Sequence, residues 1–208
     1  MESTRKKLIG YVSGRDFPLL IDKDIRSLDV INIAFGAVEN DRVIYKAPDG
    51  FEKELQRVRS VNPQCKLVLS VGGWTAGGFS EAAATEEGRT LFAQTSAALL
   101  ERYALDGLDI DWEYPTSSEA GISSSPDDTK NFTLLMRDLR KVLGKDKLLT
   151  CATIADGKYV DFPACIKYMD FVNIMAYDVA NPPQHHTTLF RSPLSGRITV
   201  SEAVEAHI

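Results

Sequence analysis

Short apolar segments alternate with amphipathic segments along the whole chain, and this alternation restricts the fold more than any other feature of the sequence. Most apolar segments are rich in Val, Ile and Leu, which is typical of strands buried on both faces of a parallel sheet. Repeated strand–helix units need right-handed parallel crossovers, which leaves an open doubly wound sheet or a (β/α) barrel. We expect the strands at residues 7–13, 30–38, 66–72, 105–113, 148–154 and 171–177.

The clearest helix is predicted for residues 126–143. Ser125 is a suitable N-cap and Pro126 suits the first helical position. Gly144 follows the last turn, where a C′ glycine commonly stands. The apolar face of this helix is expected to contain Phe132, Leu135, Met136, Leu139, Val142 and Leu143.

The number of strand–helix units bounds the extent of the fold. Further helices are expected at residues 52–59 and 85–103, and the capping-box spacing of Thr199 and Glu202 predicts another helix start. Six units occupy the 208 residues, whereas a closed barrel has eight and typically takes ~250 residues. We therefore expect residues 1–208 to form one partial domain, a (β/α)8 TIM barrel without its last two units.

The composition of the chain argues against several classes of protein. With 24 basic and 29 acidic side chains and no basic stripe, the chain gives no reason to expect a nucleic-acid partner. No segment approaches the ~18 consecutive apolar residues of a membrane span, and no signal peptide is recognisable at the N-terminus. Three widely spaced cysteines (Cys65, Cys151 and Cys165) form neither a disulfide framework nor a zinc motif, so we expect them to be buried.

The fourth predicted strand carries a row of carboxylates. Side chains alternate along a strand, so Asp109, Asp111 and Glu113 share one face, with neighbouring Cα atoms ~6.5 Å apart. The same alternation occurs in an edge strand with one solvated face. The fourth position among six parallel units argues against an edge, and Glu113 ends the strand where barrel enzymes place their chemistry.

Three neighbouring carboxylates cannot all ionise cheaply, because like charges and burial both raise the pKa of a carboxyl group. A proton shared among Asp109, Asp111 and Glu113 would leave Glu113 protonated near neutral pH. A general acid requires that state. The row therefore predicts an acid catalyst at Glu113.

Two other strand ends carry weaker signals. Gly72 and Gly73 end the third strand and would let the backbone approach a ligand closely, while Trp74 beside them could stack on a sugar. A phosphate loop is the alternative, but no G-x-G-x-x-G or G-K-[ST] pattern follows. Tyr177 and Asp178 end the sixth strand. On their own they are explained equally well as ordinary polar residues at the end of a strand.

Together the three segments resemble glycoside hydrolase family 18, the chitinases and related endo-β-N-acetylglucosaminidases. The resemblance extends over nearly all 208 residues, and the fourth-strand pattern D-G-x-D-x-D-x-E is its most specific part. The matching residues are Asp106, Gly107, Asp109, Asp111 and Glu113, then Ser70, Gly72 and Gly73 of S-x-G-G, and Met175, Tyr177 and Asp178 of M-x-Y-D.

The resemblance implies a retaining, endo-acting and substrate-assisted hydrolysis of β-1,4-linked N-acetylglucosamine polymers. Glu113 would protonate the glycosidic oxygen while the substrate's 2-acetamido oxygen attacks the anomeric carbon to give an oxazolinium ion. Water deprotonated by Glu113 would then open this ion. Asp111 would accept the acetamido N–H, and Tyr177 would donate to the acetamido carbonyl oxygen.

The remaining site residues follow from the same resemblance. Asp109 would act behind Asp111, and no metal or organic cofactor is implied. Phe35 fits either barrel packing or a sugar contact. The expected supporting and substrate-binding residues are Tyr11, Ser70, Gly73, Trp74, Met175 and Asp178. The resemblance further implies non-proline cis peptides at Ala34–Phe35 and Glu113–Tyr114.

One departure from the family pattern affects the expected activity. The family has a tryptophan on its eighth strand beneath the reacting sugar, and this sequence contains no counterpart of that strand. We expect the parent protein to be an exported chitinase and the 208 residues alone to be nearly inactive, with unpaired edges at residues 7–13 and 171–177 able to self-associate. An N-glycan endoglycosidase and a non-catalytic chitin-binding fragment remain alternatives.

Overall fold

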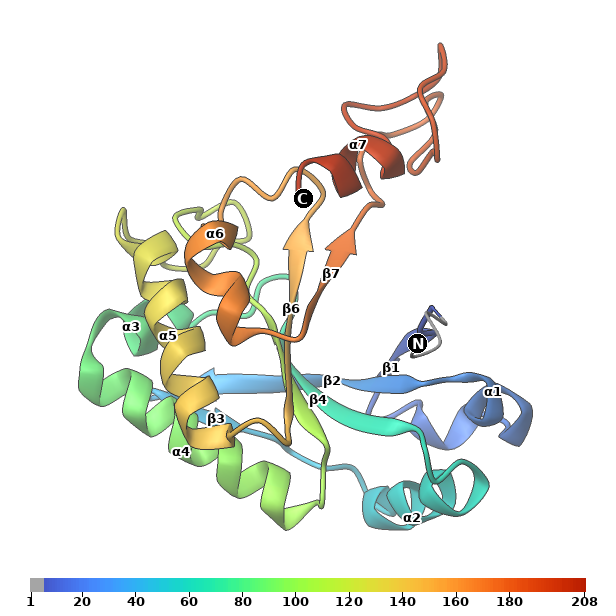
Figure 1. The fold of residues 1–208 in the computed structure, drawn as a ribbon, viewed down its shortest axis with the longest axis vertical. Helices are drawn as coiled ribbons and strands as arrows, with labels where there is room; N and C mark the ends of the chain where they lie inside the picture. Colours follow the sequence, from blue (N-terminus) through green and yellow to red (C-terminus); the bar gives the residue numbers. More distant parts are fainter. Residues whose placement is uncertain (1–5) are drawn as a thin grey trace.

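A strongly curved parallel sheet forms the centre of the computed structural model, which describes residues 6–208 (Figure 1). The parallel strands run in the order β1-β2-β4-β5-β6-β7, and β3 pairs antiparallel with the end of β2. The strands are β1 (Ile9–Ser13), β2 (Val30–Glu39), β3 (Arg42–Ile44), β4 (Lys66–Gly72), β5 (Gly107–Asp111), β6 (Leu148–Ile154) and β7 (Phe171–Met175). Among the described residues, β1 and β7 are the edges of the parallel sheet, as expected.

Helices follow the strands and most of them cover the outer face of the sheet, whereas the last helix lies beyond the C-terminal ends of β6 and β7 (Figure 1). They are α1 (Asp22–Ser27), α2 (Phe51–Val61), α3 (Phe79–Ala84), α4 (Glu86–Arg102), α5 (Asp128–Leu143), α6 (Phe162–Cys165) and α7 (Val200–Glu205), with 3-10 turns at Phe17–Leu19 and Ile166–Tyr168. This curled half of a (β/α) barrel confirms the predicted fold class. No helix of the described part is long and apolar enough to cross a membrane.

The side-chain parity of β5 matches the prediction. Leu108, Ile110 and Trp112 are buried beneath the helices, and the Trp112 ring stacks on Phe79 of α3 with centroids 5.4 Å apart. Asp109 and Asp111 have the opposite parity and therefore face the concave side of the sheet. The regular strand ends at Asp111, so Glu113 lies in the segment that follows it.

The start of α5 corrects the sequence prediction. The helix begins at Asp128, so Pro126 is not its first residue, and the Ser125 hydroxyl instead accepts from the N–H of Asp127 at 3.3 Å. Asp128 is fully buried, and its carboxylate accepts the backbone N–H of Ser125 at 2.7 Å, which offsets part of the cost of burial. Val142 was expected on the apolar face and is 44% exposed, since it lies at the margin of that face.

Several other local predictions are confirmed. Thr199 and Glu202 form a capping box at α7, and Gly144 ends α5 with φ of 69°. All three cysteines are free and buried. Four strands and helices of the described part were not predicted, because each is too short to show a clear hydrophobic period: β3, α1, α3 and α6.

We predict that Ile110→Ala lowers the free energy of unfolding by about 2–5 kcal/mol, because it removes buried methyl groups and leaves a cavity. Val142→Ala, on an exposed position of α5, is the control and is expected to change it by less than about 0.5 kcal/mol. Urea unfolding of both variants measures the difference. Equal small losses would contradict the burial of Ile110 beneath the helices.

Candidate active site

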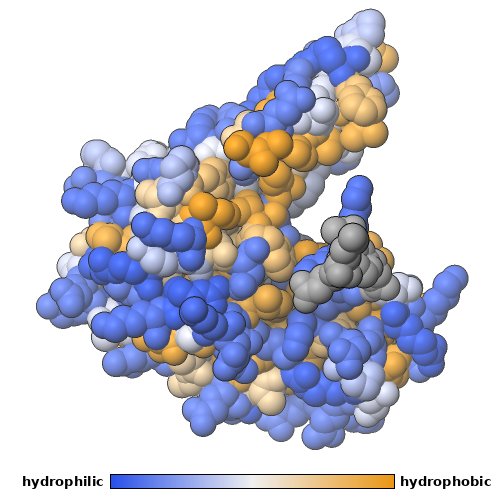
Figure 2. Space-filling model, in the orientation of Figure 1, coloured by the Kyte–Doolittle hydropathy of each residue, from blue (hydrophilic) through white to orange (hydrophobic). Residues whose placement is uncertain are grey.

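The concave side of the sheet opens into a cleft at the C-terminal ends of the strands. Figure 2 shows the molecule hollowed between the lobe that carries α7 and the N-terminal strand region, with apolar residues along part of the hollow. The main cleft encloses about 620 Å³. Its lining residues are Trp74, Glu113, Tyr114, Glu119, Ile154, Met175, Tyr177, Asp178 and Arg197.

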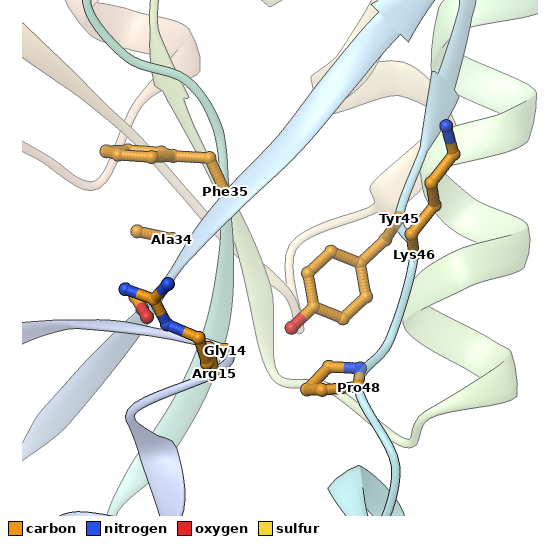
Figure 3. Close-up of a pocket in the computed structure, with 8 residues that line it drawn as sticks. Gly14, Arg15, Ala34, Phe35, Tyr45, Lys46 and Pro48 are labelled. Carbon is orange, nitrogen blue, oxygen red and sulfur yellow. The ribbon is translucent and has the colours of Figure 1, made fainter.

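Two smaller hollows continue the cleft towards β1 and β2. The first encloses about 200 Å³ and is lined by Tyr11, Phe35, Asp111, Ala152, Asn173, Ile174, Met175 and Tyr177. It shares Met175 and Tyr177 with the main cleft and shares Phe35 with the second hollow. The second hollow encloses about 260 Å³, and Figure 3 shows Phe35 and Tyr45 on opposite sides of it. The structure therefore brings predicted residues from β1, β2, β5 and β7 to adjoining hollows at one end of the sheet.

Asp109 lies at the bottom of this site, with no exposed surface. Its Oδ2 accepts hydrogen bonds from the hydroxyls of Tyr11 and Ser70, both at 2.8 Å. Its Oδ1 accepts from the Thr150 hydroxyl at 2.6 Å and from Nδ2 of Asn173 at 3.1 Å. Tyr11 and Ser70 thus contact the residue they were expected to support.

Burial raises the pKa of Asp109, and the four hydrogen bonds oppose that rise because they favour the charged carboxylate. Burial also raises the pKa of Tyr11, which keeps its hydroxyl protonated as a donor. Three of the four partners, Tyr11, Ser70 and Thr150, bind through hydroxyl groups, which can donate to the carboxylate or accept its proton.

Asp111 is 4% exposed and differs from Asp109 in its bonding, since its buried Oδ1 has no hydrogen-bond partner among the described residues. Its pKa is raised to about 8, first by burial and then by the charges of Glu113 and Asp109. Asp111 therefore holds a proton at neutral pH.

Glu113 also has a raised pKa, caused by burial, which the neighbouring Tyr114 hydroxyl partly opposes. The direction agrees with the predicted role of a protonated acid. The pKa of Tyr177 is raised by burial and then by the charges of Asp111 and Glu113, so its hydroxyl stays a donor. The acidic row and this tyrosine together offer both proton donors and acceptors to a ligand in the cleft.

The paired glycines at the end of β4 let the backbone approach β5 and Phe35 closely. Their expected approach to a ligand stays a prediction. A Cβ on Gly72 would lie 2.0 Å from the carbonyl oxygen of Asp111, and one on Gly73 would lie 3.0 Å from the Phe35 ring. The N–H of Gly73 donates to the same Asp111 carbonyl at 2.9 Å. These glycines fix the backbone of the acidic row.

Aromatic side chains line the cleft around Glu113. Trp74 is 55% exposed and makes an edge contact with Tyr114, whose ring stacks on Tyr159 with centroids 5.1 Å apart. Phe35 is 45% exposed over the smaller hollows, although its ring also packs against Gly73. The two expected peptides, Ala34–Phe35 and Glu113–Tyr114, are both cis.

Sequence reasoning missed some residues of the site. Thr150 and Asn173 were visible as single polar residues inside apolar strands, and this was the signal for an inward polar layer. Glu119 and Arg197 lie in loops, where no periodicity marks them. His186 lies beside Asp178, with its Nδ1 3.2 Å from the Asp178 carboxylate. Within residues 6–208, no cluster of His, Cys, Asp and Glu is arranged to hold a metal ion.

The geometry can be compared with known proteins. A family model described as "Glycosyl hydrolases family 18" matches residues 7–208. The chain belongs to this family. Chitinase A1 of Niallia circulans is 36% identical over 166 residues, which cover 72% of this chain and 24% of that protein. Chitotriosidase-1 of Mus musculus is 35% identical over 172 residues, which cover 76% of this chain and 34% of that protein.

Solved structures agree with this membership. An N-acetylglucosaminidase from Paenibacillus barengoltzii, described as belonging to glycoside hydrolase family 18, superposes with a TM-score of 0.90 at 41% identity, covering 97% of this chain and 64% of that one. The chitinase domain of a Clostridium difficile spore coat protein gives a TM-score of 0.90 at 34% identity, covering 99% and 62%. The family 18 chain described here thus spans less than two thirds of each of these relatives.

We predict that the stability of the native chain falls as pH rises from about 4 to about 8. In that window folded Asp111 keeps a proton that the unfolded chain releases, and each unit of pKa difference is worth ~1.4 kcal/mol. Asp111→Asn has no such proton to lose, so its free energy of unfolding should fall less steeply. Urea unfolding of both proteins at pH 5, 6.5 and 8 tests this, and parallel curves would contradict the raised pKa.

Proposed function

We propose that this chain is the catalytic part of a retaining, endo-acting glycosidase that hydrolyses β-1,4-linked N-acetylglucosamine polymers such as chitin. The observation that carries the proposal is the row of Asp109, Asp111 and Glu113, which opens at its outer end into a cleft lined by Trp74 and Tyr177. Chitinase A1 and chitotriosidase-1 are relatives whose names agree with this substrate.

In the proposed reaction, Glu113 donates its proton to the glycosidic oxygen as the bond to the anomeric carbon breaks. The acetamido oxygen of the same sugar attacks that carbon and forms an oxazolinium ion, so no nucleophile from the protein is required. Glu113, now ionised, then takes a proton from a water molecule that opens the ring with net retention. The raised pKa of Glu113 supports the first step, because a carboxyl group must hold its proton at neutral pH to donate it.

Asp111 and Tyr177 are proposed to hold the acetamido group. Asp111 would accept its N–H and stabilise the positive charge on the ring once its own proton has passed to Asp109, and Tyr177 would donate to its carbonyl oxygen. The unpartnered Oδ1 of Asp111 and the raised pKa of Tyr177 support these roles. Asp109, held by Tyr11 and Ser70, would act behind Asp111 by sharing this proton.

The length of the adjoining hollows supports a polymeric substrate. The main cleft and the two hollows adjoin through shared residues and together provide space for several sugar units. Trp74 would stack on a sugar beside the scissile bond, and Met175 and Asp178 would line the subsite of the reacting sugar. Phe35, with Gly73 beneath it, would contact the sugars on the other side.

We predict that Glu113→Gln in the whole enzyme lowers the rate of hydrolysis of N-acetylglucosamine oligomers by a factor of ~10² or more. The affinity for these oligomers should stay unchanged. The amide keeps the shape of the carboxyl group but has no proton to donate. Calorimetric titration with the tetramer and product analysis by chromatography measure the two effects, with Trp74→Ala as a control that weakens binding. Equal turnover of the oligomers by the whole enzyme and by the same enzyme with Glu113→Gln would contradict the assignment.

An endo-β-N-acetylglucosaminidase acting on N-glycans is the second candidate. It is favoured by the fact that the same acid and acetamido chemistry operates on both substrates, and the loops around the cleft would decide between them. Comparing cleavage of chitin oligomers with cleavage of a high-mannose glycopeptide separates the two activities. Faster cleavage of the glycopeptide would replace chitin as the proposed substrate.

Because chitin is an extracellular polymer, we also propose that the whole enzyme is exported. Detection of the enzyme in culture medium would test this proposal.

We further propose that residues 1–208 alone bind oligosaccharides but turn them over slowly, and self-associate through the edges of the sheet. No described strand lies between β1 and β7, and unpaired strand edges favour pairing with another chain. Sedimentation velocity over a concentration series should show species larger than a monomer. A monomer at all concentrations would contradict the association, and rapid turnover by the 208 residues would contradict the slow turnover.

A further inference from the structure

Asp128 is a fully buried carboxylate that the proposed reaction does not use. It begins α5, on the convex side of the sheet relative to the acidic row. Its three described partners are one hydroxyl and two backbone N–H groups, none of which is charged. A buried carboxylate with neutral partners is costly and is expected to be retained only where its bonds are needed.

The three partners lie in three different segments. Oδ1 accepts the Ser80 hydroxyl of α3 at 2.8 Å, and Oδ2 accepts the N–H of Ser125 at 2.7 Å and that of Thr116 at 3.3 Å. The Ser125 bond is local, whereas the bonds to Ser80 and Thr116 reach 48 and 12 residues along the chain. Asp128 therefore joins segments that are distant in the sequence.

Both distant partners belong to segments that carry walls of the cleft. Thr116 has a positive φ of 62° and follows Glu113 by three residues, on the segment that continues to Glu119. Ser80 lies in α3, directly after the loop that begins with Trp74. A second bond joins the same two segments, from the Ser123 hydroxyl to Glu81 at 2.6 Å.

We propose that Asp128 is a positioning residue, which holds the segment carrying Glu113 and Glu119 against the segment carrying Trp74 and thereby sets the width of the cleft between them. It touches neither substrate nor Glu113 and acts through Thr116 and Ser80. The effect on ligand binding rests on the proposed function, while the effect on the two segments does not.

The mechanical part is tested by amide hydrogen exchange in the native chain and in Asp128→Ala. Loss of the carboxylate should speed exchange across residues 114–127 at least tenfold and leave β6 and β7 unchanged. Asp138→Ala is the matched control, since Asp138 lies on the same helix and binds Arg89 at 2.9 Å away from the cleft. Unchanged exchange in residues 114–127, or an equal increase throughout the sheet, would overturn the proposal.

Two further variants keep the test decisive if Asp128→Ala does not fold. Asp128→Asn can present its oxygen to both N–H groups and its NH₂ to Ser80, so it should restore native exchange. Ser80→Ala removes only the bond to α3 and should speed exchange at Thr116 without affecting Ser125. Native exchange at Thr116 in Ser80→Ala would overturn the link between the two segments.

The functional part is tested by titration with the N-acetylglucosamine tetramer. The dissociation constant should rise about tenfold in Asp128→Ala and stay native in Asp128→Asn and Asp138→Ala. Native affinity in a folded Asp128→Ala would overturn the role in the cleft. If the native chain does not bind the tetramer, the proposed function fails, and the exchange measurements still decide whether Asp128 couples the two segments.

Discussion

Four hydrogen bonds to one buried carboxylate hold the curved sheet in its shape. Asp109 on β5 accepts from Ser70 on β4 and from Thr150 on β6, its two neighbours in the sheet. It also accepts from Tyr11 on β1 and Asn173 on β7, which are the two edge strands. A flat sheet would separate these edges by the width of several strands, so bonding both to one residue requires the strong curl seen in Figure 1.

The members of the acidic row differ in their surroundings. Asp109 has four hydrogen-bond partners that oppose the rise of its pKa, whereas Asp111 lacks a partner for its Oδ1 and has a pKa raised to about 8. Asp109 contributes to the raised pKa of Asp111, and both lie beneath the more open Glu113. Three similar carboxyl groups in one row therefore differ in how readily they hold a proton.

The sequence predicted the parallel strands and the inward parity of the acidic row well, since strands buried on both faces are unmistakably apolar and every second residue must face the same way. β4 and β6 end where expected. β5 is shorter than predicted at both ends, and its ladder stops before Glu113. The role of Gly72 could not be inferred from the sequence, because its neighbour Asp111 is distant along the chain. Glu119, Arg197 and the buried bonds of Asp128 were missed for the same reason: they depend on how loops pack together.

The position of Glu113 just beyond the last paired residue of β5 separates the scaffold from the chemistry. The strands below it are fixed by ladder bonds and by Asp109. The loop that begins at Glu113 is not paired with a neighbouring strand. An exchange of residues 115–127 for those of another family member would therefore leave the sheet intact if it kept the bonds to Asp128 and the buried side chains of Ala120 and Ile122. A fold built in this way can acquire new substrates through changes in its loops, at little expense in stability.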